Sequence, residues 1–262
     1  MNKIKNSPLY FLEYQPNVTY SDGNPVKHKN LENRSVLSNE LVIIVQNYNG
    51  EKVTFTSRTV EYQDKIFIAP LPNPVHILLN SGIENYNHSV SKLRILRNDC
   101  QLDNIENGIH ILNIGIDNTN SNFNDLVKFK MMSVISLVTS LEAFLNQIIS
   151  NDFIYEQTKR EKTQKLNKKK IESTQVTFKE KLTLVINQVL NNPDFSKDNE
   201  VIIERITELY DLRREVIHLK TYSENEMGLY FKSIGKLLDI EIENIIIAIK
   251  KYMNLIRPKF VE

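Results

Sequence analysis

The sequence predicts an α+β protein, with a β-rich N-terminal module at residues 1–118 and an antiparallel bundle of about four helices at residues 119–262. Three observations support this. Short β-rich runs separated by turn residues fill the first 115 or so positions. A polar stretch, DNTNSNFND, follows from Asp117 to Asp125. After it, apolar residues recur every three or four positions, which is the helical period.

The β-rich prediction rests on seven runs: LVIIVQNY (41–48), KVTFTS (52–57), TVEY (59–62), KIFIAP (65–70), VHILL (75–79), KLRIL (92–96) and HILNIGI (110–116). Asn49-Gly50, the PLPNP run ending at Pro74, and Asn107-Gly108 supply turn residues between them. We therefore expect a strand at each run.

The first long helix is expected over residues 122–151, with Asn122 as N-cap and Asp125 in the first turn, where a carboxylate favours the helix dipole. Apolar residues cover most of its circumference and leave one narrow polar stripe, made of Ser133, Ser136, Ser140 and Gln147. A helix of this kind belongs in the middle of a bundle.

Three more helices follow from their start and stop signals. Thr177-x-x-Glu180 has the spacing of a capping box, and the helix that it starts ends at Asn191 to Pro193. A second runs from about residue 196 to His218. Ser223-x-x-Glu226 starts the last helix, whose apolar stripe predicts one continuous element from residue 227 to 256.

Composition excludes several classes of function. The formal net charge is +1, so no global field indicates a nucleic acid, a membrane or an acidic partner. A single cysteine, Cys100, forms no internal disulfide and no multi-thiolate metal site, and we expect neither metal nor cofactor. The glycine-rich nucleotide-binding loops are absent from the sequence.

Neither export nor membrane insertion is expected. The N-terminal residues lack the continuous apolar segment of a signal peptide. The apolar run at residues 131–149 is interrupted by serines, Glu142 and amides, which favours a buried helix over a membrane span. We therefore expect a cytoplasmic protein.

The segment LRREVIHLK, residues 212–220, carries the strongest chemical signal. Two interpretations stay open for Arg213 and His218. Either side chain could simply complement the negative end of the helix dipole, worth roughly 0.3–1 kcal/mol. Alternatively, an imidazole that exchanges protons and a forked guanidinium that matches a phosphate supply what RNA cleavage needs, without a metal.

The Arg-x4-His motif in LYDLRREVIHLK, together with SLVTSLEAFLNQIIS (136–150), resembles the HEPN superfamily of helical proteins. The resemblance covers roughly residues 120–257. It implies a metal-independent endoribonuclease of toxin, antiviral-defence or stress systems, leaving a 2′,3′-cyclic phosphate, and a homodimer whose two motifs share one cleft. Arg213 would stabilise the phosphate, and His218 would transfer a proton or orient the substrate.

Two other functions remain open. One is a non-catalytic HEPN-like module that binds RNA or a nucleotide, or acts as a dimeric scaffold. It is favoured by Arg214, since the family usually has a small polar residue after the motif arginine. The other is a helical interaction protein with a coincidental motif. In the endoribonuclease and in the non-catalytic module alike, the N-terminal module would serve as a recognition or regulatory part. The sequence identifies no triggering or neutralising protein partner.

Supporting residues are predicted around the motif. Residues five apart on a helix point about 140° apart, whereas Arg214 and His218, four apart, share a face. The last turn therefore unwinds, or the composite site takes one group from each subunit. Glu142 could hold a motif arginine in place or form an ion pair of no chemical role.

A lysine-rich segment could contribute to substrate binding. Residues 157–170 contain seven basic side chains and one acid. Lys168, Lys169 and Lys170 would contact phosphates of the RNA backbone, or the segment is a solvated connection between helices.

Overall fold

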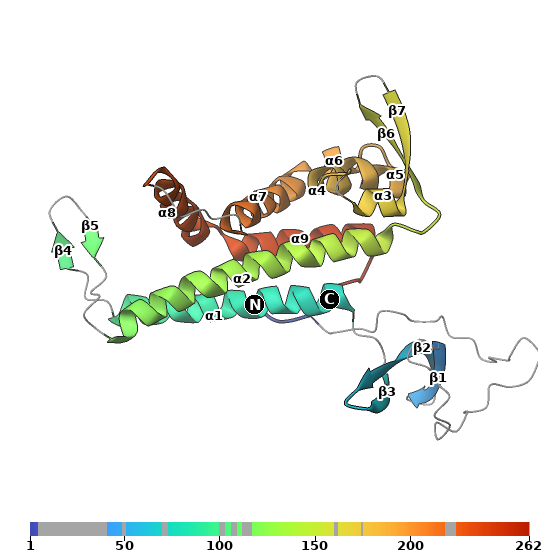
Figure 1. Ribbon diagram of the computed structural model, residues 1–262, viewed down its shortest axis with the longest axis horizontal. Helices are drawn as coiled ribbons and strands as arrows, with labels where there is room; N and C mark the ends of the chain where they lie inside the picture. The colour runs from blue at the N-terminus through green and yellow to red at the C-terminus, as the bar shows by residue number, and fades with distance from the viewer. Residues whose placement is uncertain are drawn as a thin grey trace, which may run out of the picture. The chain divides into compact units, whose positions relative to one another are not determined.

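The computed structural model describes residues 1–4, 41–48, 51–69, 73–99, 103–105, 109–111, 117–159, 162–173, 175–217 and 224–261. It is mostly helical, with small antiparallel sheets (Figure 1). Contacts divide the chain into a helical unit, Met1–Lys5 with Val75–Glu262, and a second unit, Asn6–Pro74. The division therefore lies at Pro74 and not at residues 118/119.

The second unit contains three strands where the sequence predicted four, because the runs 52–57 and 59–62 lie in a single strand. Strands β1 (Leu41–Tyr48), β2 (Glu51–Tyr62) and β3 (Lys65–Ala69) pair antiparallel in that order. Tyr48 pairs with Glu51, which leaves two connecting residues. The turn predicted there, Asn49-Gly50, lies outside the described residues. Gln63 and Asp64, with φ of 49° and 56°, turn the chain between β2 and β3.

Residues 74–99 correct the prediction of strands at 75–79 and 92–96. They form one helix, α1 (Pro74–Asp99), which belongs to the helical unit. Val75, Leu79 and Ile83 recur at four-residue spacing and are fully buried. The β-branched residues of these runs suit a strand, yet burial of one helical face outweighs that propensity. Downstream, strands β4 (Asp103–Ile105) and β5 (Ile109–Ile111) form a short pair.

Helix α2 (Asp117–Ile148) lies at the centre of the bundle, as predicted, although it starts before the expected Asn122. The segment Asn120–Ile148 is long and apolar enough to cross a membrane, with hydropathy 1.3, but half of its most apolar stretch is buried within the protein. Its serine stripe faces α1. The hydroxyl of Ser133 donates to the carbonyl of Gly82 at 2.8 Å, and that of Ser140 to Val75 at 2.9 Å. Serines therefore let the two helices approach closely.

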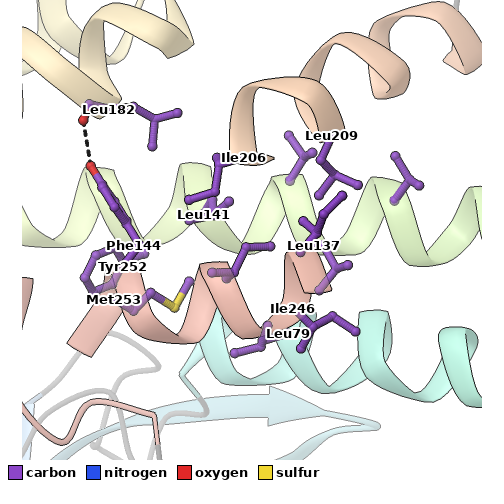
Figure 2. Packing of buried hydrophobic residues seen from close by; sticks show 14 of the residues in the cluster. Leu79, Leu137, Leu141, Phe144, Leu182, Ile206, Leu209, Ile246, Tyr252 and Met253 are labelled. Atoms are coloured by element: carbon purple, nitrogen blue, oxygen red, sulfur yellow. Dashed lines mark hydrogen bonds between the residues drawn. The ribbon is translucent and has the colours of Figure 1, made fainter. Parts of the chain in front are cut away.

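Helices α7 (Glu200–Ile217) and α9 (Ile242–Ile256) cover the other side of α2. Figure 2 shows Ile206 beside Leu141 and Leu209 beside Leu137, so α7 runs antiparallel to α2. From α9, Ile246 and Tyr252 enter the same core. Burial of these large apolar side chains is the dominant favourable contribution to the stability of the bundle.

The lysine-rich segment forms a hairpin and a short helix, which the sequence analysis did not anticipate. Strands β6 (Ile154–Lys159) and β7 (Lys162–Asn167) pair antiparallel, and α3 (Lys168–Glu172) follows directly. The amide of Gln157 is buried and donates to the carboxylate of Glu180 at 2.5 Å. This contact fastens the base of the hairpin to the bundle.

The helix predicted from Thr177 begins as expected, since the Thr177 hydroxyl accepts the backbone N–H of Glu180 at 3.2 Å. It comprises α4 (Phe178–Glu180), a π-helical segment η1 (Lys181–Val185) and α5 (Ile186–Val189). In η1 the carbonyl of Leu182 accepts the buried hydroxyl of Tyr252 at 2.8 Å (Figure 2). A side chain that bonds into the helical ladder is a known cause of such a distortion.

Two predictions about the last helices need correction. Residues 196–218 hold a short helix, α6 (Phe195–Asp198), before α7. The expected continuous helix at 227–256 is broken into α8 (Glu224–Asp239) and α9 at Ile240 and Glu241. At the break, the nearly buried ammonium of Lys130 donates to the carbonyl of Leu238 at 2.5 Å. A lysine from α2 therefore caps the C-terminal end of α8.

Candidate functional site

Arg213 lies one turn before the end of α7, on the face directed into the bundle. It follows Leu209 by four residues and precedes Val216 by three, and both of these side chains are buried. Its guanidinium Nε is inaccessible to solvent and has no hydrogen-bond partner. Within the described part of the chain, Arg213 takes part in none of the ion pairs. A permanently charged group is thus held partly buried with no counter-charge among these residues.

Arg214 occupies a different environment. It lies in the last turn of α7, its side chain is 61% exposed, and it approaches the carboxylate of Asp211 at 3.7 Å. An exposed pair of this kind contributes little to stability. The interpretation of a cation complementing the helix dipole therefore fits Arg214, whereas it does not explain the burial of Arg213.

His218, the proposed proton-transfer residue, lies outside the described residues, as does the predicted N-cap Ser223. Helix α7 ends at Ile217, immediately before His218. Of the two motif residues, the structure therefore places only Arg213 within its described part.

Glu142 is near a lysine and forms no ion pair with Arg213. The carboxylates of Glu142 and Glu172 oppose the effect of burial on Lys181, whose pKa is lowered chiefly by desolvation. The antiparallel register explains the separation: Glu142 follows Leu141, which lies beside Ile206, whereas Arg213 is a full turn beyond Leu209. Within one chain Glu142 is therefore not paired with Arg213, and its supporting role stays a prediction.

The lysines proposed to bind substrate lie at the start of α3, far along the chain from the motif. Lys168 reaches Glu172 at 3.9 Å, and Lys169 and Lys170 are exposed. The Asn167 side chain accepts the backbone N–H of Lys170 at 3.2 Å and caps the helix. These three charges therefore extend from an ordered turn, which the alternative of a solvated connection did not foresee.

A cavity of about 780 Å³ opens between α7, α8 and α9, and sequence reasoning did not find it. Arg213 is not among its lining residues. The walls carry two cations and five carboxylates: Arg205 and Lys236 against Glu208, Asp211, Glu215, Asp239 and Glu241. One of these acids, Glu215, is paired with Lys236 at 2.5 Å. The excess of negative charge makes this cavity a poor site for a phosphate.

Over the ranges that the structure describes, no three His, Cys, Asp or Glu side chains are grouped to hold a metal ion. His76 and His88 lie on α1 and not in strands or turns. His76 is buried, and burial lowers its pKa, while a hydrogen bond to the backbone of Phe260 acts in the opposite direction.

Comparison with known proteins adds no family: no family model matches the chain, and neither a curated protein nor a solved structure matches it.

Proposed function

We propose that this chain is a metal-independent endoribonuclease of the HEPN type, acting in the cytoplasm in a toxin, antiviral-defence or stress setting. One observation carries the proposal: the Nε atom of the Arg213 guanidinium is inaccessible to solvent and lacks a hydrogen-bond partner in the described structure. A buried polar group without a hydrogen bond costs about 1–3 kcal/mol, and more when it is charged. A bound phosphate would supply both the acceptor oxygens and the missing negative charge.

The proposed chemistry needs the imidazole of His218 next to this arginine. The 2′-oxygen of a ribose attacks the adjacent phosphorus, its proton passes to a base, and the bond from phosphorus to the 5′-oxygen breaks with protonation of that oxygen. His218 serves in these proton transfers, and Arg213 stabilises the charge that accumulates on the phosphoryl oxygens. The products carry a 2′,3′-cyclic phosphate and a 5′-hydroxyl.

A homodimer formed through the motif end of the bundle would bring two motifs together. Apolar side chains are exposed around this end: Ile217 in the last turn of α7, and Met227, Leu229 and Phe231 in the first two turns of α8. Leu229 and Phe231 are each 65% exposed. Met227 and Phe231, four residues apart, lie on one face of α8, and large exposed apolar side chains of this kind are found at contact sites between proteins. The strands at residues 41–69 would then belong to a recognition or regulatory module.

Cleavage of labelled RNA in EDTA tests the activity. We expect the wild type to produce 2′,3′-cyclic phosphate ends, and Arg213→Ala and His218→Ala each to lower the rate by about 10²-fold or more. Arg205→Ala is the matched control, because it removes an exposed arginine from the same helix two turns earlier. Rates of all variants are compared after their unfolding midpoints have been shown to agree.

The outcomes separate the candidate functions. Binding of RNA without cleavage would favour the non-catalytic module, and cleavage that survives Arg213→Ala would refute the proposed role of this residue. The dimer is tested by light scattering of Phe231→Glu, which should become monomeric. Val201→Glu serves as its control, since Val201 is equally exposed, at 66%, at the other end of α7. A wild type that is monomeric at assay concentrations would contradict the shared cleft.

A further inference from the structure

The first residues of the chain are held along α1 by two reciprocal pairs of hydrogen bonds. The backbone N–H of Ile4 donates to Asn80 Oδ1 at 2.7 Å, and Asn80 Nδ2 donates back to the Ile4 carbonyl at 2.9 Å. The Met1 ammonium donates to Asn87 Oδ1 at 2.7 Å, and Asn87 Nδ2 donates to the Met1 carbonyl at 2.8 Å. Each side-chain amide thus bonds both the backbone nitrogen and the carbonyl of one residue, as a neighbouring strand would.

The spacing of the two asparagines matches an extended segment. Seven residues of α-helix rise about 10.5 Å. Three residues of extended chain span about 10 Å. Asn80 can therefore bond Ile4 while Asn87 bonds Met1 only because the segment Met1–Ile4 is nearly fully extended. A helical or turned segment would be too short for the second pair.

Side chains add selectivity to this backbone recognition. Ile4 is only 4% exposed and joins the main hydrophobic core, which includes Val75 and Leu79 of α1. The Lys3 ammonium lies 3.1 Å from a carboxylate oxygen of Glu84, which stands between the two asparagines on the same face of the helix. Asn80 is itself 9% exposed, so its contacts with Ile4 are made in a largely dry environment.

We propose that Asn80, Glu84 and Asn87 form a binding site for an extended peptide with a basic residue followed by a large aliphatic one, and that Met1–Ile4 occupy it as a releasable strap. The two backbone pairs require only an extended segment. Glu84 and the apolar contact of Ile4 select the side chains. In a peptide with a residue before the position of Met1, the nitrogen at that position would be a backbone N–H and could still donate to Asn87 Oδ1.

Docking of the strap has a consequence for the chain that follows. The unit Asn6–Pro74 leaves from Met1–Lys5 and returns at Val75, and both flanking segments belong to the helical unit. The strap and the start of α1 are therefore the two points at which the chain of this unit is joined to the helical unit. Its release would leave the unit attached at Pro74 only, and a competing peptide of the same chemistry could hold the strap off.

A peptide-binding experiment with the full chain tests the site. The variant Ile4→Asp should undock the strap, because it places a carboxylate in the core. We expect it to bind the peptide Met-Asn-Lys-Ile-Lys, labelled at its C-terminal end, at least tenfold more tightly than the wild type, whose own strap competes. Adding Asn80→Leu to this variant should abolish binding. Peptide carrying Asp in place of the isoleucine should not bind. Equal affinity of the wild type and Ile4→Asp, or no binding at millimolar peptide, would overturn the proposal.

Hydrogen exchange gives a second readout if Ile4→Asp does not fold. In the wild type the Ile4 amide should be protected, and Asn80→Leu should speed its exchange by at least tenfold. Asn85→Leu is the matched control: the Asn85 side chain bonds within α1, to the carbonyl of Ser81 at 2.8 Å, and its hydrogen bonds in the described structure involve no residue of the strap. An Ile4 amide that exchanges freely in the wild type, or equally slowly in both variants, would contradict a docked strap.

Discussion

Gly82 shows how one missing side chain sets the distance between α1 and α2. A Cβ at this position would lie 2.7 Å from two carbon atoms of the buried Leu137 side chain and 3.3 Å from its backbone nitrogen. No common rotamer change relieves contacts on this scale in a filled core. Close approach of the helices, together with the serine hydroxyls that bond α1 carbonyls, therefore depends on glycine here.

We predict that Gly82→Ala lowers the free energy of unfolding by about 1–3 kcal/mol, because overpacking exceeds the gain in helix propensity. Gly228→Ala is the control, since a Cβ at this exposed helical position meets no atom within 4 Å. It should raise the stability by about 0.5–1 kcal/mol. Urea unfolding measures both, and the same sign for the two variants would contradict the packing described for Gly82.

A second prediction at this scale concerns the contribution of the Tyr252 hydroxyl to stability. It is buried and donates to Leu182 in the π-helical segment, and its burial raises its pKa far above the ordinary value. Tyr252→Phe should lower the free energy of unfolding by about 1–2 kcal/mol, because a buried carbonyl loses its donor. Tyr230→Phe, on α8, removes a hydroxyl without a hydrogen bond in the described structure, and should leave the urea midpoint nearly unchanged.

The role of a single residue could be predicted from the sequence where it depends only on residues nearby in the chain. The capping role of Thr177 follows from its spacing to Glu180 alone. The position of Glu142 relative to Arg213 could not be predicted, because it depends on the register of two helices far apart in the sequence. The inward direction of Arg213 follows from its stripe, three and four residues from buried neighbours, but its unpartnered Nε needs the full packing.

At the scale of elements, α1 contained a helical signal that its β-branched runs obscured. Asn73-Pro74 has proline at the first helical position, where its missing N–H is not needed. Val75, Leu79 and Ile83 follow at helical spacing. Short runs such as VHILL are ambiguous between strand and helix, and length decides between them only when the flanking residues are assigned correctly.

An ion-pair cluster between α1 and α2 makes their association depend on pH. Hydrogen bonds from Lys128 and Lys92 lower the pKa of Asp125 from 3.8 to about 2. The carboxylate bonds Lys128 at 2.5 Å and Lys92 at 2.9 Å. Because the folded pKa lies below the ordinary value, the stability from this group is present above about pH 4 and is lost as the pH falls towards 2.

We predict that Asp125→Asn weakens the decrease in stability between about pH 4 and pH 2, as measured by urea unfolding at several pH values. Asp194→Asn changes the net charge equally but replaces a carboxylate that takes part in no ion pair within the described ranges. It should leave the pH dependence close to that of the wild type. A pH profile unchanged by Asp125→Asn would show that the cluster contributes nothing to folding.

A further prediction concerns the lysines of α3 and the salt dependence of RNA binding. If Lys168, Lys169 and Lys170 contact RNA phosphates, replacing all three with Gln should reduce the slope of log affinity against log salt by up to about 0.7 per lost contact with single-stranded RNA. Replacing Lys197, Lys232 and Lys251, three exposed lysines on other helices, is the control for net charge. An equal reduction in both triple variants would assign the effect to overall charge.

At the scale of the whole molecule, the order of the long helices after residue 117 was predictable and the arrangement around them was not. Periodicity placed α2, α7 and the apolar face of α9, because burial of a continuous stripe dominates their energetics. The break between α8 and α9 depends on Lys130 reaching the Leu238 carbonyl across the bundle. The hairpin β6–β7 depends on Glu180 accepting a bond from Gln157, again a tertiary contact.

The candidate site is predictable in part for the same reason. Its motif could be recognised from one short stretch of sequence, whereas the acidic cavity between α7, α8 and α9 arises from three elements. This cavity matters for the proposed function, because its excess of carboxylates makes it a poor place for an anion and leaves Arg213 as the candidate phosphate ligand on α7.

The affinity for an RNA with a 2′-deoxy group at each cleavable position tests the central claim most directly, since it reports phosphate binding without turnover. We predict that Arg213→Ala weakens binding at least about tenfold and reduces the salt slope by about 0.7, the loss of one phosphate contact. Arg205→Ala should change neither. Equal affinities for the wild type and Arg213→Ala, or equal losses in the two variants, would contradict a phosphate site at Arg213.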